Sequence, residues 1–170
     1  DIEGAELEVL AAAIPVLRAA LGDEDSRVYV AAGGSLGRIG TDEARTLLID
    51  SLDSPFWVLA KTAMEQLVPT RDRRAADRVA GRLIDRELEG VVTDPVRRDR
   101  ALDLARALVE FRATSRVDDL ATAAARQTDP PLADELQKTV ELLRTIAAHG
   151  EHGRPWTDEL ASERPEVRRV

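Results

Sequence analysis

Arginine recurs at every fourth position in one stretch of the chain: Arg74, Arg78, Arg82 and Arg86. Residues four apart lie on the same face of an α-helix, so a helix over 72–88 would carry these arginines in one ridge. A guanidinium group presents a planar fork of donors that matches a carboxylate or a phosphate. The stripe therefore predicts docking of an acidic peptide or a phosphorylated partner. The alternative is a solvated helix face whose arginines pair with nearby acids such as Asp77 and Asp85.

Phe56 and Trp57 are adjacent aromatics in a chain that has only two Phe, two Trp and one Tyr. Consecutive helix positions point about 100° apart, so the two rings cannot both face the core. We expect one ring to pack against the preceding turn and the other to be partly exposed. An exposed aromatic is a candidate anchor for a partner, but it could equally staple the start of the helix.

The residues do not favour catalysis or metal binding. His149 and His152 are the only histidines, there is no cysteine, and a catalytic zinc site usually has three well-held ligands. We find neither a His-Glu-x-x-His pattern nor a nucleophile elbow, and the carboxylates stand mostly at expected turn and cap positions. We therefore expect a protein that is not an enzyme, with no catalytic residue, no metal and no cofactor.

The glycine-rich stretch from Gly33 to Gly40 superficially suggests a phosphate loop. No strand is expected before it, and it lacks the GxGxxG order and the Gly-Lys-Ser/Thr ending. Glycine inside a helix costs roughly 1 kcal/mol relative to alanine. The simplest reason to tolerate this cost is close approach of a neighbouring helix.

Composition and charge narrow the classes further. The chain has 170 residues, 44% hydrophobic and only 3% aromatic, which favours packed helices, and it has no apolar run long enough to cross a bilayer. The net charge of −8 argues against broad binding to nucleic acid, although residues 71–116 form a local basic zone with 12 basic and 9 acidic groups. Abundant arginine, scarce lysine and the absence of asparagine suggest a bacterial, GC-rich gene.

Apolar positions at spacings of three and four predict eight or nine antiparallel helices joined by short loops. The expected helices before the arginine stripe cover about 11–21, 27–39, 42–52 and 55–67, with Gly40 ending the second. Those from the stripe onward cover about 72–88, 96–111, 117–126 and 132–148, with a further helix beginning near Thr157. Asp129, Pro130 and Pro131 are expected to form a rigid break.

One spacing recurs along the chain, in which Leu is followed seven residues later by an apolar residue at the start of a helix: Leu21–Val28, Leu52–Leu59 and Leu160–Val167. The first two copies lie 31 residues apart, and Ala32 and Leu36 then match Ala63 and Leu67. The stretch from Leu21 to Gly40 resembles a HEAT repeat, most closely the short type named after phycobilin lyases. Self-similarity at such a period is typical of repeat arrays.

The resemblance implies one right-handed α-solenoid of about four repeats plus a truncated one. Its segments would be a partial or capping piece (1–10), regular repeats (11–68), degenerate repeats (69–150) and the start of a further repeat (151–170). We expect the chain to be part of a longer protein. The second helices of the repeats would line the concave side, at about 11–21, 42–52, 72–88 and 117–127. Arg97, Arg98 and Arg100 would belong to the convex side.

The family's usual role implies a cytoplasmic scaffold that binds another protein or an acidic peptide in its concave groove. The candidate contacts are Arg74, Arg78, Arg82, Arg86, Phe56 and Trp57. We expect no nucleic-acid partner and no membrane association, and the sequence does not indicate an oligomeric state. Two alternatives remain open: a tetrapyrrole-handling protein related to phycobilin lyases and, on weaker grounds, a HEAT-like protein that binds nucleic acid.

Overall fold

The computed structural model of this chain describes residues 12–89 and 94–151, and every regular element in them is helical. The α-helices in chain order are α2 (Ile14–Ala20), α3 (Ser26–Ile39), α4 (Asp42–Ser51), α5 (Trp57–Leu67), α6 (Arg73–Arg82), α7 (Pro95–Phe111), α8 (Val117–Ala125) and α9 (Pro130–Glu151). Three shorter helical turns lie between some of them. The 3-10 turns are η1 (Val68–Thr70), after α5, and η4 (Thr114–Arg116), before α8, and the π-helical turn η2 (Leu83–Glu87) follows α6. The predicted all-helical fold is confirmed for this part of the chain.

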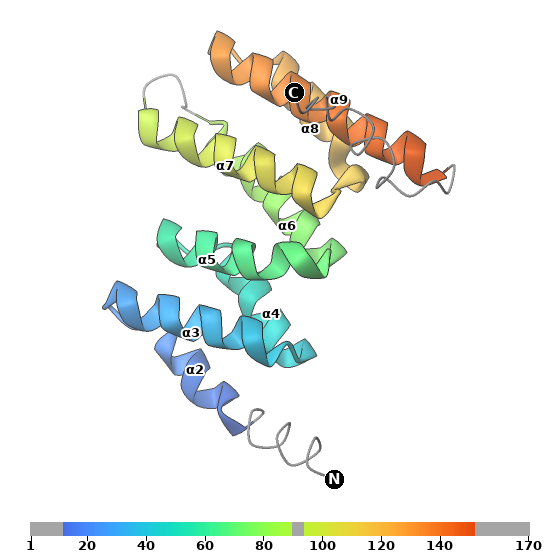
Figure 1. The fold of residues 1–170 in the computed structure, drawn as a ribbon. Coiled ribbons are helices and arrows are strands. Elements are labelled where there is room, and N and C mark those ends of the chain that lie inside the picture. The colour runs from blue at the N-terminus through green and yellow to red at the C-terminus, as the bar shows by residue number, and fades with distance from the viewer. Residues whose placement is uncertain (1–11, 90–93, 152–170) are drawn as a thin grey trace, which may run out of the picture.

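The helices form two layers (Figure 1). Helices α3, α5, α7 and α9 run side by side in one layer, and α2, α4, α6 and α8 lie behind them in the other. Each helix of the second layer packs on the helix that follows it in the chain, so that α2 contacts α3, α4 contacts α5, α6 contacts α7 and α8 contacts α9. Stacked helix pairs of this kind are the arrangement of an α-solenoid, in which each pair covers the apolar face of its neighbour.

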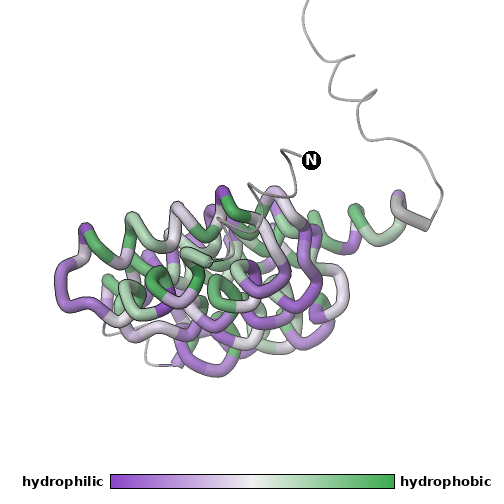
Figure 2. Tube along the Cα trace, turned by 90° about the horizontal axis from the view of Figure 1, so that it is seen from below, coloured by the Kyte–Doolittle hydropathy of each residue, from purple (hydrophilic) through white to green (hydrophobic). Residues whose placement is uncertain are grey.

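The hydrophobic core lies between the layers and extends from one pair to the next. Its largest fully buried side chains are mostly leucines, among them Leu36, Leu52, Leu67, Leu104 and Leu136. Figure 2 looks at the stack from below, and hydrophilic residues dominate the turns at its rim. Alanines such as Ala63 and Ala105 are completely buried between the leucines, where their small side chains let the helices approach closely.

Local sequence signals set several helix ends. The Asp25 carboxylate caps α3 by accepting a hydrogen bond from the Arg27 backbone N–H at 2.9 Å. Gly40 ends the same helix with a φ of 66°, a left-handed conformation that favours glycine, as the sequence predicted. Asp94 caps α7 from outside the helix, with Pro95 in the first turn, where a missing N–H costs nothing.

The structure corrects three predicted boundaries. Helix α5 begins at Trp57 instead of Pro55, because the Ser54 hydroxyl accepts the Phe56 N–H at 3.1 Å and holds a turn there. The helix expected over 72–88 is α-helical only to Arg82 and continues as the π-turn η2. Pro130 does not break the chain but begins α9, since proline is well tolerated in a first helical turn.

The packing of α3 on α5 explains two of the helix glycines. A Cβ on Gly33 would lie 3.2 Å from the Thr62 methyl carbon, and one on Gly37 would lie 2.8 Å from Gln66 Cγ. The predicted close approach is therefore confirmed at Gly33 and Gly37. It is wrong at Gly34, where a Cβ would meet nothing within 4 Å.

Several predictions fall outside the described residues. These are the partial segment at 1–10, the further repeat expected over 151–170 apart from its first residue, and the third copy of the spacing, Leu160–Val167. Across residues 12–89 and 94–151, we find no helix with the length and apolar character that crossing a membrane requires.

Candidate functional site

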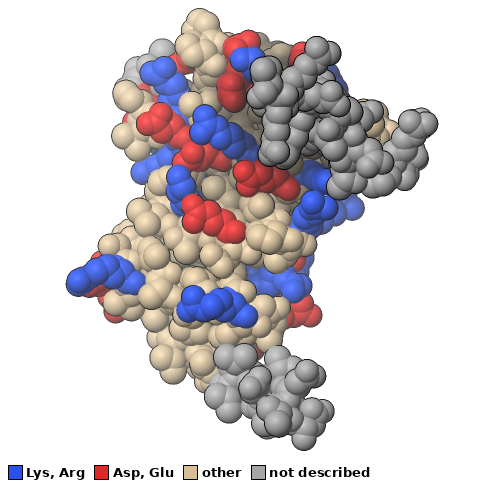
Figure 3. All heavy atoms as spheres, viewed as in Figure 1, with Lys and Arg blue, Asp and Glu red and all other residues tan. Residues whose placement is uncertain are grey.

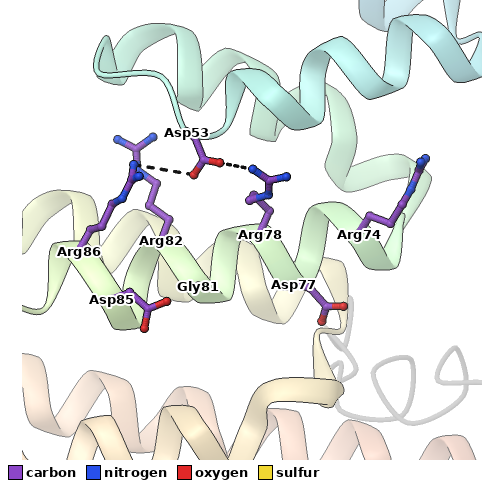
Figure 4. A pocket seen from close by; sticks show the side chains of 8 residues that line it. All are labelled: Asp53, Arg74, Asp77, Arg78, Gly81, Arg82, Asp85 and Arg86. Carbon is purple, nitrogen blue, oxygen red and sulfur yellow. Dashed lines mark hydrogen bonds and ion pairs between the residues drawn. The ribbon is translucent and has the colours of Figure 1, made fainter.

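The arginine stripe lies on α6 and η2, in the same layer as α2 and α4. Three of its side chains are well exposed: Arg74 at 60%, Arg78 at 46% and Arg86 at 61%. They follow one edge of the helix, and all three reach toward the preceding repeat (Figure 4). A shallow hollow of about 330 Å³ lies along them, lined also by Asp53, Asp77, Gly81 and Asp85. We call this hollow the stripe hollow.

Asp53, in the turn between α4 and α5, is the acid that the arginines share. Its carboxylate pairs with the guanidinium of Arg78 through Oδ2, and its Oδ1 lies 3.9 Å from Nη1 of Arg86. Figure 4 shows the carboxylate between these two side chains. Asp53 therefore already makes the kind of contact that the stripe predicts for a ligand, namely a carboxylate held by two arginines.

Arg74 binds a different acid, Asp72, which caps the start of α6. The Asp72 carboxylate accepts hydrogen bonds from the Arg74 backbone N–H at 2.8 Å and from its side-chain Nη2 at 2.9 Å. The Arg74 side-chain hydrogen bond is the main cause that holds the pKa of Asp72 below its usual value, and partial burial opposes it. Arg74 is therefore an exposed cation at the end of the stripe, and Asp72 holds its side chain.

Each exposed arginine of the stripe pairs with an acid, as on a solvated face, but these acids are not Asp77 and Asp85. Asp77 and Asp85 project from the side of the helix away from Asp53 (Figure 4). Asp77 accepts a hydrogen bond from the Ser115 hydroxyl at 2.6 Å, and its nearest cation is Arg73 at 3.9 Å. The exposed stripe arginines pair instead with Asp53, in the turn between α4 and α5, and with Asp72, the cap of α6.

Arg82 must be removed from the predicted docking surface, because its side chain is only 5% exposed. Its Nε lies 3.2 Å from a Glu87 carboxylate oxygen, and its Nη1 donates to the carbonyl oxygens of Leu52 and Ser54. Its guanidinium also lies 5.2 Å from the centre of the Trp57 ring. Arg82 therefore ties α6 to the turn before α5 and does not face a partner.

The π-turn makes the Arg82–Glu87 pair possible. In an α-helix, residues five apart point about 140° away from each other. A π-helix closes its hydrogen bonds over five residues, here from the Leu88 N–H to the Leu83 carbonyl oxygen at 3.1 Å. The wider turn places Glu87 beneath Arg82, where both are buried. No spacing in the sequence signals this turn, so the burial of Arg82 cannot be predicted from the i+4 pattern.

One aromatic ring is partly exposed, as predicted, but the other packs on the core and not on the preceding turn. Trp57 is half-buried against the core and lies within reach of two guanidinium groups, those of Arg82 at 5.2 Å and Arg100 at 5.6 Å. Phe56 is 48% exposed and stacks on Tyr29 of α3 with ring centres 5.5 Å apart. This stack also buries Tyr29, whereas its neighbour Val28 remains partly exposed.

A second hollow, of about 460 Å³, adjoins the first where the α4–α5 turn, η2 and the start of α7 meet. We call it the junction hollow. Its lining includes Arg86, Arg97 and Arg100, so Arg97 and Arg100 come beside the stripe although α7 belongs to the other layer. Arg98 does not join them, because its guanidinium lies 3.7 Å from Asp129.

The described residues hold no group of three or more His, Asp or Glu side chains placed to bind a metal ion. His149 lies in α9, with Nδ1 2.8 Å from the Thr145 carbonyl oxygen. His152, the other histidine, lies outside the described residues.

Comparison with known families adds one finding to this geometry. Residues 7–68, a span that ends with α5 and the first residue of η1, match the family described as HEAT repeats. The match supports the HEAT-repeat family. It does not distinguish the phycobilin-lyase type from other HEAT repeats, and no curated protein and no solved structure matches the chain.

Proposed function

We propose that this chain is a protein-interaction module and not an enzyme, and that it binds an acidic segment of a partner protein along α6. HEAT repeats commonly mediate such interactions, and the proposal takes the array to be right-handed with α2, α4, α6 and α8 on its concave side. The observation that carries it is the position of Asp53, a carboxylate already held between two stripe arginines. A partner carboxylate in the stripe hollow would meet the same guanidinium groups.

The exposed ends of the stripe favour an extended ligand over a single ion. Arg74 and Arg86 lie three helical turns apart, about 18 Å along the helix axis, which a peptide of five or six extended residues spans. Arg74, Arg78 and Arg86 are exposed, and water weakens their ion pairs with the more buried acids Asp72 and Asp53. An acidic peptide can therefore exchange with the internal partners at low cost.

Fluorescence anisotropy with a labelled peptide of alternating Glu and Ser tests this proposal, with the Gln counterpart as ligand control. We expect the native chain to bind the Glu peptide, with affinity that falls as salt rises. Arg74→Glu with Arg78→Glu should lower that affinity by about tenfold or more, because both direct ion pairs are reversed.

The matched control is Arg38→Glu with Arg106→Glu, which makes the same change of charge at exposed positions on α3 and α7. This variant should bind within about twofold of the native chain. Equal losses in the two double variants would mean that net charge alone attracts the peptide. Equal binding of the Glu and Gln peptides would contradict the proposal directly.

A further inference from the structure

Trp57 has an arginine on each of two neighbouring elements, and the two arginines have different electrostatic surroundings. Arg82 comes from α6 and Arg100 from α7, with guanidinium carbons 5.2 and 5.6 Å from the indole centre. Arg82 has a carboxylate partner and two carbonyl oxygens. Arg100 has no ion pair within 4.0 Å among the described residues, and its Nε is buried without a hydrogen-bond partner there.

An arginine in this state is costly to keep. Its Nε is a buried donor without a partner, which loses its hydration and gains nothing in return. The indole face offsets part of that cost. An anion that enters the hollow beside Arg100 would compensate the rest, so the site favours a negatively charged ligand.

The acids around the junction hollow limit how much negative charge it can accept. They are Asp53, Asp85, Glu87 and Glu89. Asp53 is engaged by Arg78 and Arg86, and Glu87 by Arg82. Arg97 is largely occupied as well, since it donates to the Arg86 and Glu89 carbonyl oxygens at 3.2 and 2.8 Å. One uncompensated guanidinium beside Asp85 and Glu89 suits a single negative charge better than a dianion.

We infer that the junction hollow is the anchoring subsite for one carboxylate side chain of the bound acidic segment, recognised by Arg100 against Trp57. This inference rests on the proposed function and refines it. The stripe hollow then guides the acidic segment along α6, and the junction hollow receives one of its residues. The two hollows share Asp53, Arg82, Asp85 and Arg86 in their linings, so one peptide can occupy both.

Trp57 provides a direct readout once Trp156, the only other tryptophan, is replaced by Phe. In this Trp156→Phe background, the Glu–Ser peptide should change Trp57 fluorescence as it binds. Arg100→Gln should lower peptide affinity by roughly tenfold and abolish the fluorescence change, because a charged hydrogen-bonded contact is lost. Arg98→Gln, on the same helix but paired with Asp129, should bind within about twofold of its parent.

Small anions separate the subsite from the proposed function. Acetate should change Trp57 fluorescence in the parent and not in Arg100→Gln, even if the peptide itself fails to bind. A stronger response to inorganic phosphate than to acetate would overturn the carboxylate assignment in favour of a phosphorylated ligand. If Arg100→Gln keeps full peptide affinity while the Arg74 and Arg78 double variant loses it, peptide binding along the stripe is supported and the junction subsite is wrong. Arg100→Gln must also keep the parent's circular dichroism and melting temperature for its loss of binding to count.

Discussion

Two successive helix contacts in the same layer, α3 with α5 and α5 with α7, are built in different ways. Between α3 and α5, glycines let the backbones approach, and the Tyr29–Phe56 stack closes one end. Between α5 and α7, long side chains form bridges, with Lys61 Nζ 3.0 Å from Asp103 and Arg100 lying over Trp57. Figure 3 shows the same contrast, since charged side chains are sparse over α3 and α5 and gather over α7.

The difference shows where this array has room for a ligand. At α3–α5, Thr62 and Gln66 pack against the glycines, and this contact lies within residues 7–68, which match HEAT repeats. Beyond that point the contacts depend on arginines and on the π-turn, and both hollows lie where this part meets the α4–α5 turn. The proposed binding groups therefore lie at the edge of the matched repeats.

The largest expected effect comes from Arg82, which joins the repeats on the irregular side. Arg82→Met leaves Glu87 buried without its cation, and we expect a loss of about 3–5 kcal/mol in the free energy of unfolding, measured by urea denaturation. Adding Glu87→Met should recover part of this loss, because no unpaired buried charge remains. A loss below about 1 kcal/mol for the single variant would show that the junction does not depend on this ion pair.

Gly33 tests the regular side of the comparison. Gly33→Leu inserts a side chain where even a Cβ would lie 3.2 Å from Thr62, and we expect a loss of about 1–3 kcal/mol in unfolding free energy. Gly34→Leu is the matched control, since its Cβ would meet nothing within 4 Å. That variant should be neutral or more stable by up to about 0.8 kcal/mol through helix propensity. Equal behaviour of the two leucine variants would refute close packing at α3–α5.

Local and long-range features differ in how well the sequence predicts them. The helices on both sides, among them α3, α7 and α8, and the Gly40 cap follow from spacing and local chemistry, which act within a few residues. The partner of Arg78 does not, because Asp53 lies 25 residues earlier and comes close only when one pair stacks on the next. The burial of Arg82 and the position of Arg100 depend on the same stacking and on a π-turn that has no sequence signature.

We expect the smallest effect from replacing equivalent helix-cap residues in the two regions. Asp25 and Asp72 each cap a helix and bind the arginine two positions later, but the Asp72 side chain is 12% exposed and that of Asp25 is 39% exposed. Asp72→Ala should lower the unfolding free energy by about 1 kcal/mol at pH 7, as loss of a helix cap does. Asp25→Ala should have a smaller effect, because water screens its carboxylate more.

The pH dependence of these variants separates an ionic cap from a simple loss of packing. Hydrogen bonds from Arg74 and Arg27 lower the folded-state pKa values of Asp72 and Asp25 below their ordinary values. Each carboxylate therefore stabilises the fold fully above the unfolded-state pKa of about 3.9, and its contribution disappears as the pH falls through the lower folded-state value. Urea denaturation should show the gap between the native chain and Asp72→Ala shrinking as the pH is lowered from 5 toward about 2. A gap that stays constant over this range would mean that Asp72 acts through its shape alone. The ionic contact between Asp72 and Arg74 would then contribute nothing to stability.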